Sequence, residues 1–330
     1  MKKSIAITLI VCMLFIVSCT TEETPAEPTK APAPTTKVKE NNSSDHINVM
    51  MRRADNWEKI VDTVVIDEEF LKKIDGSTAT VPITSELYRQ FFDYDDSYIN
   101  DTVYHSTTHN AYMNLIDKKE TDIIFVTEPS KDELKTAKKK GIELDVVPIV
   151  KEGFVFIVNK DNPVESLTTE QIVKIYTDEY TNWKDLGGED KDILAYQREP
   201  NSGSQTAMEQ MVMKGKKMKH GLNSNTISGM GELVSAVSDF NSKNLGSIGY
   251  SYYYYLNNLY KSDHIKVLNI DGISPEDENL ISGKYPFTTG YYAVIRKDES
   301  SDSPARKLRD WFLTDEGQEV LSMAGYCKIK

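Results

Sequence analysis

The sequence predicts an α/β protein whose sheets are largely parallel. Short apolar runs typical of buried strands recur along the chain, and the clearest is residues 123–126 (IIFV). Stretches with helical periodicity lie between these runs and begin at capping residues. The length of 330 residues is sufficient for a sizeable core and for two lobes.

Elements of both kinds are expected throughout the body of the chain. Two capping-box pairs, Ser130 with Glu133 and Thr168 with Gln171, mark helix starts, and the first of these helices ends at Gly141. Further helices are expected at 82–92, 110–118, 203–214, 230–241, 304–313 and 315–323, the last two after Ser303 and Thr314. Further strands are expected at 142–150, 153–159, 193–196, 246–251, 265–270 and 290–295.

The charge balance limits the partners of the protein. The chain has 39 Lys and Arg against 51 Asp and Glu, which gives a formal net charge of -12 at pH 7. Nucleic-acid binding requires a basic face, so no nucleic acid is expected as a partner.

Residues 1–18 are predicted to be a signal peptide. Lys2 and Lys3 precede an apolar run, Ile5 to Val17, that is too short for a typical membrane span. The segment ends in IVSC (residues 16–19), which resembles the lipobox of bacterial lipoproteins. The resemblance implies cleavage before Cys19 and a lipid such as palmitate on its sulfur. Ordinary secretion and an uncleaved anchor are the alternatives.

Residues 19–48 are predicted to be a disordered tether, because they are rich in Pro, Thr and Ser and have almost no large apolar side chains. Cys12 leaves with the signal peptide and Cys19 carries the lipid. Only Cys327 then remains, so no disulfide within the chain is expected. Lipid, tether and globular body together describe a protein held at the outer face of the cell membrane, on its extracellular or periplasmic side.

Ligands of α/β proteins bind at the carboxyl ends of strands, against helix N-termini, so strand-to-helix junctions are candidate sites. At the first, Gly76-Ser77-Thr78 leads into a helix with Pro82 in its first turn. The unpaired N–H groups of such a helix start favour an anion. Simple capping by Ser and Thr is the alternative explanation.

At the second junction, Thr107 or Thr108 begins a helix. His105 and His109 lie beside them, but two histidines without a nearby carboxylate or cysteine do not complete a metal site. Neither a metal nor another cofactor is therefore expected. At the third junction Glu128 follows the strand at 123–126, where it either faces the cleft or is a solvated turn residue.

The fourth junction places Arg198 ahead of Ser202-Gly203-Ser204. The planar guanidinium group suits an oxyanion, the hydroxyl groups can bind it, and glycine allows close approach of the backbone. A structural cap with a surface arginine is the alternative. The pattern matches neither Gly-x-Ser-x-Gly nor a P-loop.

This fourth junction, REPNSGSQT at 198–206, resembles the arginine–Ser-Gly-Thr signature of phosphate-binding proteins that feed high-affinity phosphate ABC transporters. Residues 148–188 resemble the stretch that follows the first lobe crossing in the same family, and residues 246–255 and 313–326 resemble its later segments. The motifs come in the same order, and the likeness covers roughly residues 64–330. It implies two α/β lobes of a periplasmic-binding-protein-like fold (type II), joined by crossover strands that act as a hinge. Lobe 1 is expected at 49–150 and 255–330, and lobe 2 at 151–254.

The resemblance implies an anion site whose position-by-position matches are Thr78, Ala79, Thr108, Glu128, Arg198, Ser202, Gly203 and Ser204. Four departures from the family pattern are Glu128 for aspartate, Thr108 for serine, Ser204 for threonine and an inserted Gln205. Glu128 is expected to accept a hydrogen bond from a P–OH group and to repel sulfate, which carries no proton.

The resemblance implies a lipid-anchored solute-binding protein, without catalysis or cofactor, that captures inorganic phosphate as a monomer and delivers it to the permease subunits of an ABC importer. Other oxyanions (sulfate, molybdate, tungstate) are the alternatives within the class. A secreted serine hydrolase would need one of His105, His109, His220 or His264 near Ser202 or Ser204. A surface adhesion or sensor protein would leave the cleft empty. The run Tyr252–Tyr255 is expected at a strand or helix end between the lobes, with a stacking platform as the alternative.

Overall fold

The computed structural model describes residues 54–219, 225–238 and 245–329. The expected signal peptide, the tether, Cys19 and His220 lie outside these ranges. Among the described helices, none is both long enough and apolar enough to cross a membrane. Residues 51–330 form one compact unit.

A seven-stranded sheet organises this unit, with the strand order β1-β2-β11-β3-β8-β5 and with β9 also beside β3. The strands are β1 (Ile74–Gly76), β2 (Ile123–Val126), β3 (Leu144–Asn159), β5 (Asp192–Ala195), β8 (Leu245–Tyr252), β9 (Ile265–Val267) and β11 (Thr288–Arg296). The α/β class expected from the sequence is confirmed.

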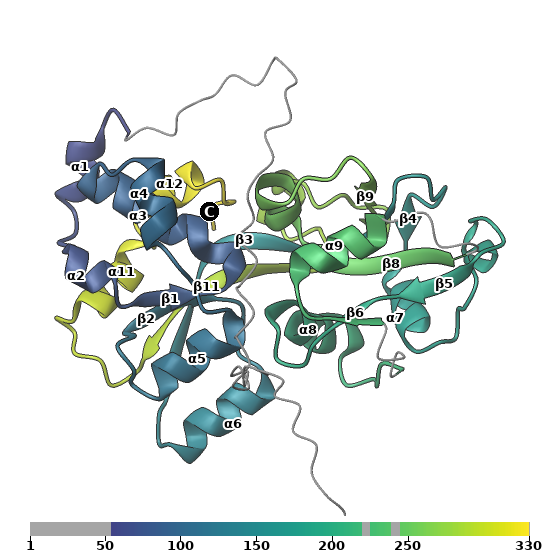
Figure 1. Cartoon of the computed structure of the whole chain (residues 1–330), viewed down its shortest axis with the longest axis horizontal. Coiled ribbons are helices and arrows are strands. Elements are labelled where there is room, and N and C mark those ends of the chain that lie inside the picture. The colour runs from purple at the N-terminus through teal and green to yellow at the C-terminus, as the bar shows by residue number, and fades with distance from the viewer. Residues whose placement is uncertain (1–53, 220–224, 239–244, 330) are drawn as a thin grey trace, which may run out of the picture. The chain divides into compact units, whose positions relative to one another are not determined.

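Strand β3 connects two parts of the molecule, which we call lobe 1 and lobe 2 (Figure 1). Its residues 144–153 pair with β11 in lobe 1, and residues 154–159 pair with β8 and β9 in lobe 2. The two strands expected at 142–150 and 153–159 are therefore one long strand, because Lys151 and Glu152 continue the extended backbone between them.

Residues 265–270, expected in lobe 1, pair with strands of lobe 2. Strand β9 lies beside β3, and β10 (Asn269–Ile270) lies beside β4 (Ser166–Leu167). The structure thus moves this part of the boundary, and the other lobe limits stay a prediction.

The expectation of largely parallel sheets is wrong for the central strands. β1 is parallel to β2 and β5 to β8, but β11 is antiparallel to β2 and β3, and β8 is antiparallel to β3. Since β3 runs from lobe 1 into lobe 2 while β8 and β11 run in the return direction, strands of opposite direction meet at the crossover.

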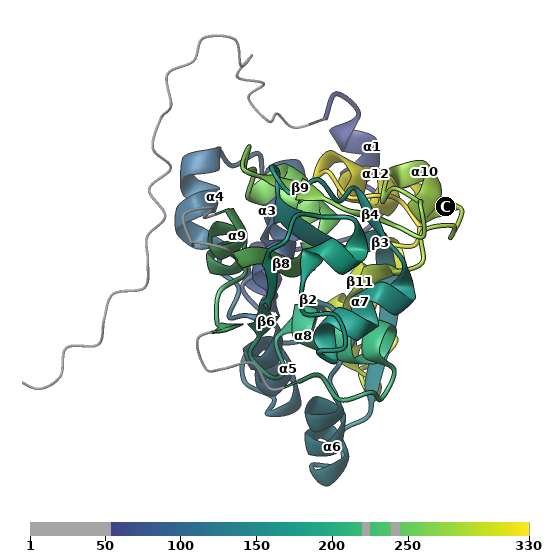
Figure 2. The same cartoon turned by 90° about the vertical axis from the view of Figure 1, so that its right-hand side faces the viewer.

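Helices cover both faces of each half of the sheet. In lobe 1, α3 and α12 lie on one face and α5 and α6 on the other; in lobe 2, α9 lies opposite α7 and α8 (Figures 1 and 2). The helices of lobe 1 and its edge are α1 (Trp57–Val61), α2 (Glu68–Leu71), η1 (Thr78–Thr80), α3 (Val81–Phe92), α4 (Asp96–Thr102), α5 (Thr108–Ile116), α6 (Lys131–Lys139), α10 (Asp277–Ile281), α11 (Pro304–Trp311) and α12 (Asp315–Met323). The others are α7 (Thr169–Tyr176), η2 (Trp183–Leu186), α8 (Gly203–Ala207), η3 (Met208–Met213), α9 (Met230–Ser238) and η5 (Tyr255–Leu259).

The local signals for helix starts are confirmed. Both capping boxes form, with the Ser130 and Thr168 side chains accepting from the backbone of Glu133 and Gln171. The starts after Ser303 and Thr314 also form. The short helices α1, α2, α4 and α10 were not expected, because four to seven residues are too few to show a helical period.

The side chains of β2 alternate between two apolar cores. Ile123 and Phe125 belong to the main core, whereas Ile124 and Val126 pack in a second core with α5 and α6. Such alternation is the rule for a strand, and it places the next two residues, Thr127 and Glu128, on opposite faces of the sheet.

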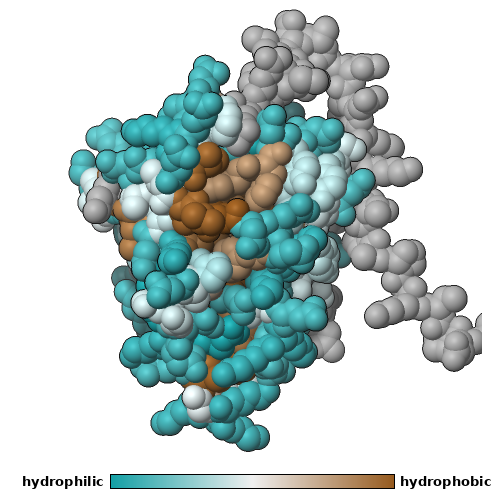
Figure 3. Space-filling view, turned by 90° about the vertical axis from the view of Figure 1, so that its left-hand side faces the viewer, coloured by the Kyte–Doolittle hydropathy of each residue, from teal (hydrophilic) through white to brown (hydrophobic). Residues whose placement is uncertain are grey.

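The end of lobe 1 that carries α1 and α2 shows an apolar area on its surface (Figure 3). Val65, which lies between these two helices, is 87% exposed and is the most exposed large apolar side chain of the described residues. This surface lies at the far end of the lobe from the β3 crossover (Figure 1).

Glu152 is a buried carboxyl group at the crossover. Its Oε1 accepts hydrogen bonds from the backbone N–H groups of Gly153 (2.8 Å) and Tyr254 (3.1 Å), while Oε2 has no hydrogen-bond partner in the described parts of the chain. Burial raises the pKa of Glu152 to about 8, although the backbone donors and the nearby Tyr291 hydroxyl oppose the rise.

The run Tyr252–Tyr255 lies beside this carboxyl group. The Tyr254 ring stacks on that of Tyr326 with 3.9 Å between centroids. The tyrosine run therefore lies where the lobes join, as expected.

The raised pKa of Glu152 predicts a loss of stability as pH rises. The folded protein keeps the proton between the ordinary pKa of 4.5 and about 8, whereas the unfolded chain releases it. Stability is therefore greatest below about pH 4.5 for this group and falls until about pH 8. In urea unfolding across this range, Glu152→Gln should lose less stability than the wild type. Parallel curves for the two proteins would show that Glu152 is ionised in the folded state.

Candidate anion-binding site

Arg198, in the short strand β6 (Gln197–Arg198), is a buried cation that contacts only neutral groups. It is 8% exposed. Its Nε donates to the carbonyl of Ile227 (3.0 Å), Nη1 to Ser204 Oγ (3.2 Å) and Nη2 to the carbonyl of Ser228 (2.5 Å). Burial lowers the pKa of Arg198, but an arginine stays protonated in proteins. The guanidinium group therefore places an uncompensated positive charge inside the protein.

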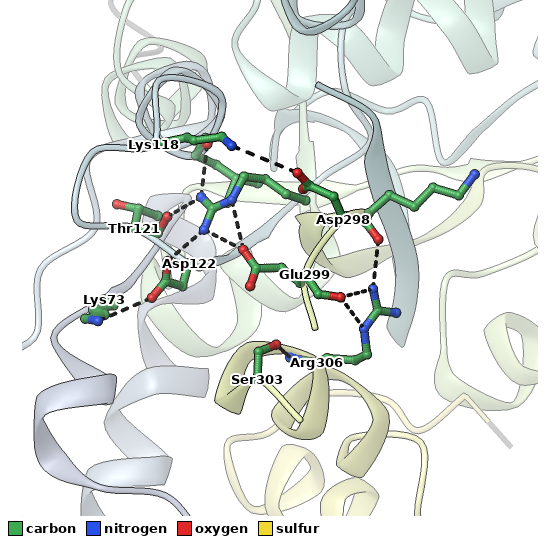
Figure 4. A network of polar contacts seen from close by, with 11 residues as sticks. Lys73, Lys118, Thr121, Asp122, Asp298, Glu299, Ser303 and Arg306 are labelled. Carbon is green, nitrogen blue, oxygen red and sulfur yellow. Dashed lines mark hydrogen bonds and ion pairs between the residues drawn. The ribbon is translucent and has the colours of Figure 1, made fainter. Parts of the chain in front are cut away.

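The other buried arginines of the described chain are all paired with carboxylates. Each contacts two of them: Arg89 with Glu86 and Asp96, Arg296 with Asp122 and Glu299, and Arg309 with Asp145 and Asp310. Figure 4 shows one such network, in which Asp122 and Glu299 lie around a guanidinium group. No carboxylate of the described residues lies within ion-pair distance of Arg198; the exposed Glu199 beside it accepts from the Ser228 hydroxyl instead. Because an unpaired buried charge is costly, this contrast marks Arg198 as a site for an anion.

Two residues of lobe 2 hold the backbone of Arg198 in place. Its N–H donates to the Tyr250 hydroxyl (2.9 Å) and to Gln205 Oε1 (3.2 Å), and the Tyr250 hydroxyl also donates to Gln205. Tyr252, two residues along β8 and so on the same face, donates to the carbonyl of Gly203 (3.0 Å). Gln205 therefore helps to position the arginine. Neither tyrosine was predicted in this role from the sequence, although their spacing of two in a strand is a usable signal.

The segment Ser202-Gly203-Ser204 begins α8, which continues into η3. Ser202 is the N-cap and its hydroxyl accepts from the Gln205 N–H (3.3 Å). Ser204 is fully buried and accepts from Arg198. The structure thus brings together the arginine and the segment that the sequence predicted.

Two threonine hydroxyls of lobe 1 lie directly against Gly203. A Cβ atom at Gly203 would be 2.6 Å from Thr127 Oγ1 and 3.0 Å from Thr108 Oγ1, so only glycine permits this approach. Thr127 is 4% exposed, and its hydroxyl makes no hydrogen bond to a described residue. It lies near the Tyr252 hydroxyl and opposes the rise in the pKa of Tyr252 that burial causes. Thr127, absent from the predicted set, belongs to this group.

The structure places Glu128 away from this group, contrary to the expectation. Its carboxylate is exposed and accepts a hydrogen bond from the Tyr292 hydroxyl (2.8 Å). The reason is the alternation along β2, because Thr127 follows the side of Phe125 while Glu128 follows that of Val126. Glu128, the acidic residue expected at the site, therefore lies on the opposite face of the strand from Thr127.

The first junction lies beside the end of β2. The Ser77 N–H donates to the carbonyl of Phe125 (2.9 Å), and the buried Ala79 accepts at its carbonyl from the Tyr326 hydroxyl (2.6 Å). Thr78 is exposed. The structure shows no hydrogen bond from Thr78 or Ala79 to Arg198, so their contact with an anion stays a prediction.

The histidines near the site have other partners. His105 is buried, with Nδ1 2.9 Å from the carbonyl of Ser77 and Nε2 3.0 Å from Thr84 Oγ1. His109 Nδ1 lies 2.8 Å from Glu133. In the described ranges no three His, Cys, Asp or Glu side chains cluster as metal ligands would, and neither Ser202 nor Ser204 bonds to a histidine.

Thr107, the residue before α5, has a strained backbone. Its φ of 86° and ψ of 159° lie in a region that glycine alone adopts readily. It directly precedes Thr108, so the strain lies at the candidate site.

Thr107→Gly should therefore stabilise the protein. Relief of strain contributes about 1–3 kcal/mol, and the added freedom of glycine in the unfolded chain costs about 0.5–1 kcal/mol. The free energy of unfolding, measured with urea, should rise by about 1 kcal/mol. The matched control Thr136→Gly, inside α6, should lower stability because its backbone is helical. A drop for both variants would refute the strain at Thr107.

The site combines three features: a buried arginine without a carboxylate partner among the described residues, hydroxyl groups on both sides, and a close contact at Gly203 between two α/β lobes. Together they define a protein that encloses a small anion. The chain belongs to the PBP superfamily, whose domain model matches residues 30–316. The expected two-lobed binding-protein-like fold is confirmed, and the chain is a solute-binding protein rather than an enzyme.

Several known proteins are similar to this chain. The chain is 29% identical to the phosphate-binding protein PstS of Staphylococcus epidermidis over 261 residues, 77% of each chain. It is 25% identical to PstS of Bacillus subtilis over 196 residues, 58% of this chain and 61% of that protein. A phosphate ABC transporter substrate-binding protein of Clostridium perfringens, solved with bound phosphate, is 27% identical with a TM-score of 0.59, covering 78% of this chain and 98% of that chain.

Proposed function

We propose that the protein binds inorganic phosphate and delivers it to the permease subunits of an ABC importer. The observation that carries the proposal is Arg198, the buried arginine that has no carboxylate partner among the described residues. The names of the relatives, and the phosphate bound in the Clostridium perfringens protein, support phosphate as that anion.

The proposed contacts come from both lobes. Arg198 supplies the positive charge, and the segment Ser202-Gly203-Ser204 supplies hydroxyl and N–H groups from lobe 2. Lobe 1 contributes Thr108 and Thr127 through their hydroxyls, and Thr78 and Ala79 from the start of η1. Glu128 has no part in this set, because its carboxylate binds Tyr292.

The proposed setting is the outer face of the cell membrane, on its extracellular or periplasmic side. There the lipid on Cys19 anchors a monomer, and residues 19–48 give it reach. The support is the sequence pattern of the first 48 residues, in which an apolar run, a lipobox-like ending and a stretch rich in Pro, Thr and Ser follow one another.

Calorimetric titration with phosphate tests the proposal and should show one site per chain. Small-angle scattering should show a smaller radius of gyration with phosphate than without it, because contacts from both lobes favour closure on the ligand. Two hydrogen bonds between the lobes are already present, from Gln210 to the carbonyl of Pro129 (3.1 Å) and from Asn201 to Asp132 (3.4 Å). No heat of binding at millimolar phosphate would refute the proposal.

A further inference from the structure

The lobe 1 side of the anion site presents hydroxyl groups. Thr127 Oγ1 is buried, has no hydrogen-bond partner in the described ranges, and lies 2.6 Å from the position of a Cβ on Gly203. Thr108 Oγ1 lies 3.0 Å from the same position. A buried hydroxyl without a partner is costly, so its position against Gly203 points to a hydrogen bond with the ligand.

The carboxylates of lobe 1 near the site are bound elsewhere or exposed. Asp75 accepts from Gly76, Ser106 and Asn114, and Glu133 accepts from Ser130 and His109. Asp132 is exposed, as is Glu128 with its Tyr292 contact.

In lobe 2, Glu199 is exposed and bonds to Ser228. The tyrosines near Arg198 are Tyr250, Tyr252 and Tyr255, and burial raises the pKa of each, so they stay neutral. Within the described ranges, no ionised acid is therefore placed to face the anion.

This difference matters because a hydroxyl and a carboxylate treat an anion differently. An ionised carboxylate only accepts hydrogen bonds, so it tolerates an anion that carries a proton and repels one that does not. A hydroxyl accepts from a P–OH group and equally donates to a fully deprotonated oxygen. Near neutral pH phosphate keeps a proton, whereas sulfate has none.

We propose that Thr127 is a specificity-determining residue, and that its hydroxyl makes the site accept tetrahedral oxyanions whether or not they carry a proton. The proposal rests on the proposed function and deepens it. The substrate class is then that of phosphate and sulfate together, with the single positive charge of Arg198 as the common attraction. The site then does not reject sulfate for its lack of a proton, the role that was expected of Glu128.

Titration of the full chain with phosphate and with sulfate, at pH 6 and pH 8, tests this. Wild type should bind sulfate within about tenfold of phosphate. Thr127→Val, which removes the hydroxyl at constant shape, should weaken both anions by a similar factor of about ten or more. Thr127→Ser keeps the hydroxyl and should keep the wild-type ratio.

Thr127→Asp should introduce selection against anions that carry no proton. It should weaken sulfate at least about 100-fold relative to phosphate at both pH 6 and pH 8, because phosphate keeps at least one proton at each pH and sulfate keeps none. Glu128→Gln should leave the ratio of the wild type unchanged. If Thr127→Asp fails to fold, the wild-type ratio and the valine and serine variants decide the matter.

Two results would overturn the inference while the proposed function stands. One is a wild type that binds phosphate but excludes sulfate by a factor of about 1,000, and the other is a ratio that changes with Glu128→Gln. Binding of neither anion would instead remove the proposed function, and this inference with it.

Discussion

Arg198→Ala should weaken phosphate binding by at least about 2 kcal/mol, or roughly 30-fold. The guanidinium group has no carboxylate partner among the described residues, so its positive charge is free for the ligand. Removing it leaves a buried anion without a counter-charge, which is one of the most costly losses at a binding site. Calorimetric titration of the purified variant measures the change.

Two further variants separate binding from folding. Arg198→Lys keeps the charge but loses the planar fork that reaches Ile227, Ser204 and Ser228, so it should restore only part of the affinity. Arg306→Ala removes a cation that pairs with Asp145 far from the site, and it should bind phosphate like the wild type. Unchanged affinity in Arg198→Ala would place the anion elsewhere.

Gly203→Ala should weaken phosphate binding by about 1–3 kcal/mol, the usual cost of overpacking, which is roughly 5- to 150-fold. The added methyl would lie 2.6 Å from Thr127 Oγ1 and 3.0 Å from Thr108 Oγ1, both on the opposite lobe. The lobes can avoid this clash by staying apart, so the variant should fold normally and yet fail to close. Scattering should then show a radius of gyration with phosphate that matches the unliganded protein.

A double variant tests the cause of this effect. Thr127→Ala removes the nearer of the two hydroxyls. In the background of Gly203→Ala it should therefore restore closure, although affinity stays below that of the wild type because the hydroxyl is lost. If Gly203→Ala closes normally on its own, the contact between the lobes is not needed for binding.

Signals confined to a few neighbouring residues were sufficient for much of the fold. Both capping boxes, the starts after Ser303 and Thr314, and the buried strand at 123–126 all form as predicted. Such signals succeed because the groups that satisfy them lie within one turn of the chain. The same holds for the junction at Arg198, where the arginine bonds to Ser204 six residues later.

Interactions between distant segments could not be predicted in this way. The antiparallel centre of the sheet follows from the path of β3 between the lobes, and a strand pattern carries no direction. Likewise, the raised pKa of Glu152 follows from burial at the crossover, which depends on packing from several elements.

Local sequence patterns were sufficient to predict the α/β class and an arginine beside a Ser-Gly-Ser helix start. These properties depend on residue types at short spacing. Two features of the site depend on long-range packing: Arg198 lacks a carboxylate partner in the described chain, and Thr127, not Glu128, lies against Gly203. Whether an arginine forms an ion pair depends on which acidic residue, often distant in the sequence, packs beside it in the folded protein. Which side chain lies against Gly203 depends on which face of β2 packs against α5 and α6, because successive side chains of a strand point to opposite faces of the sheet.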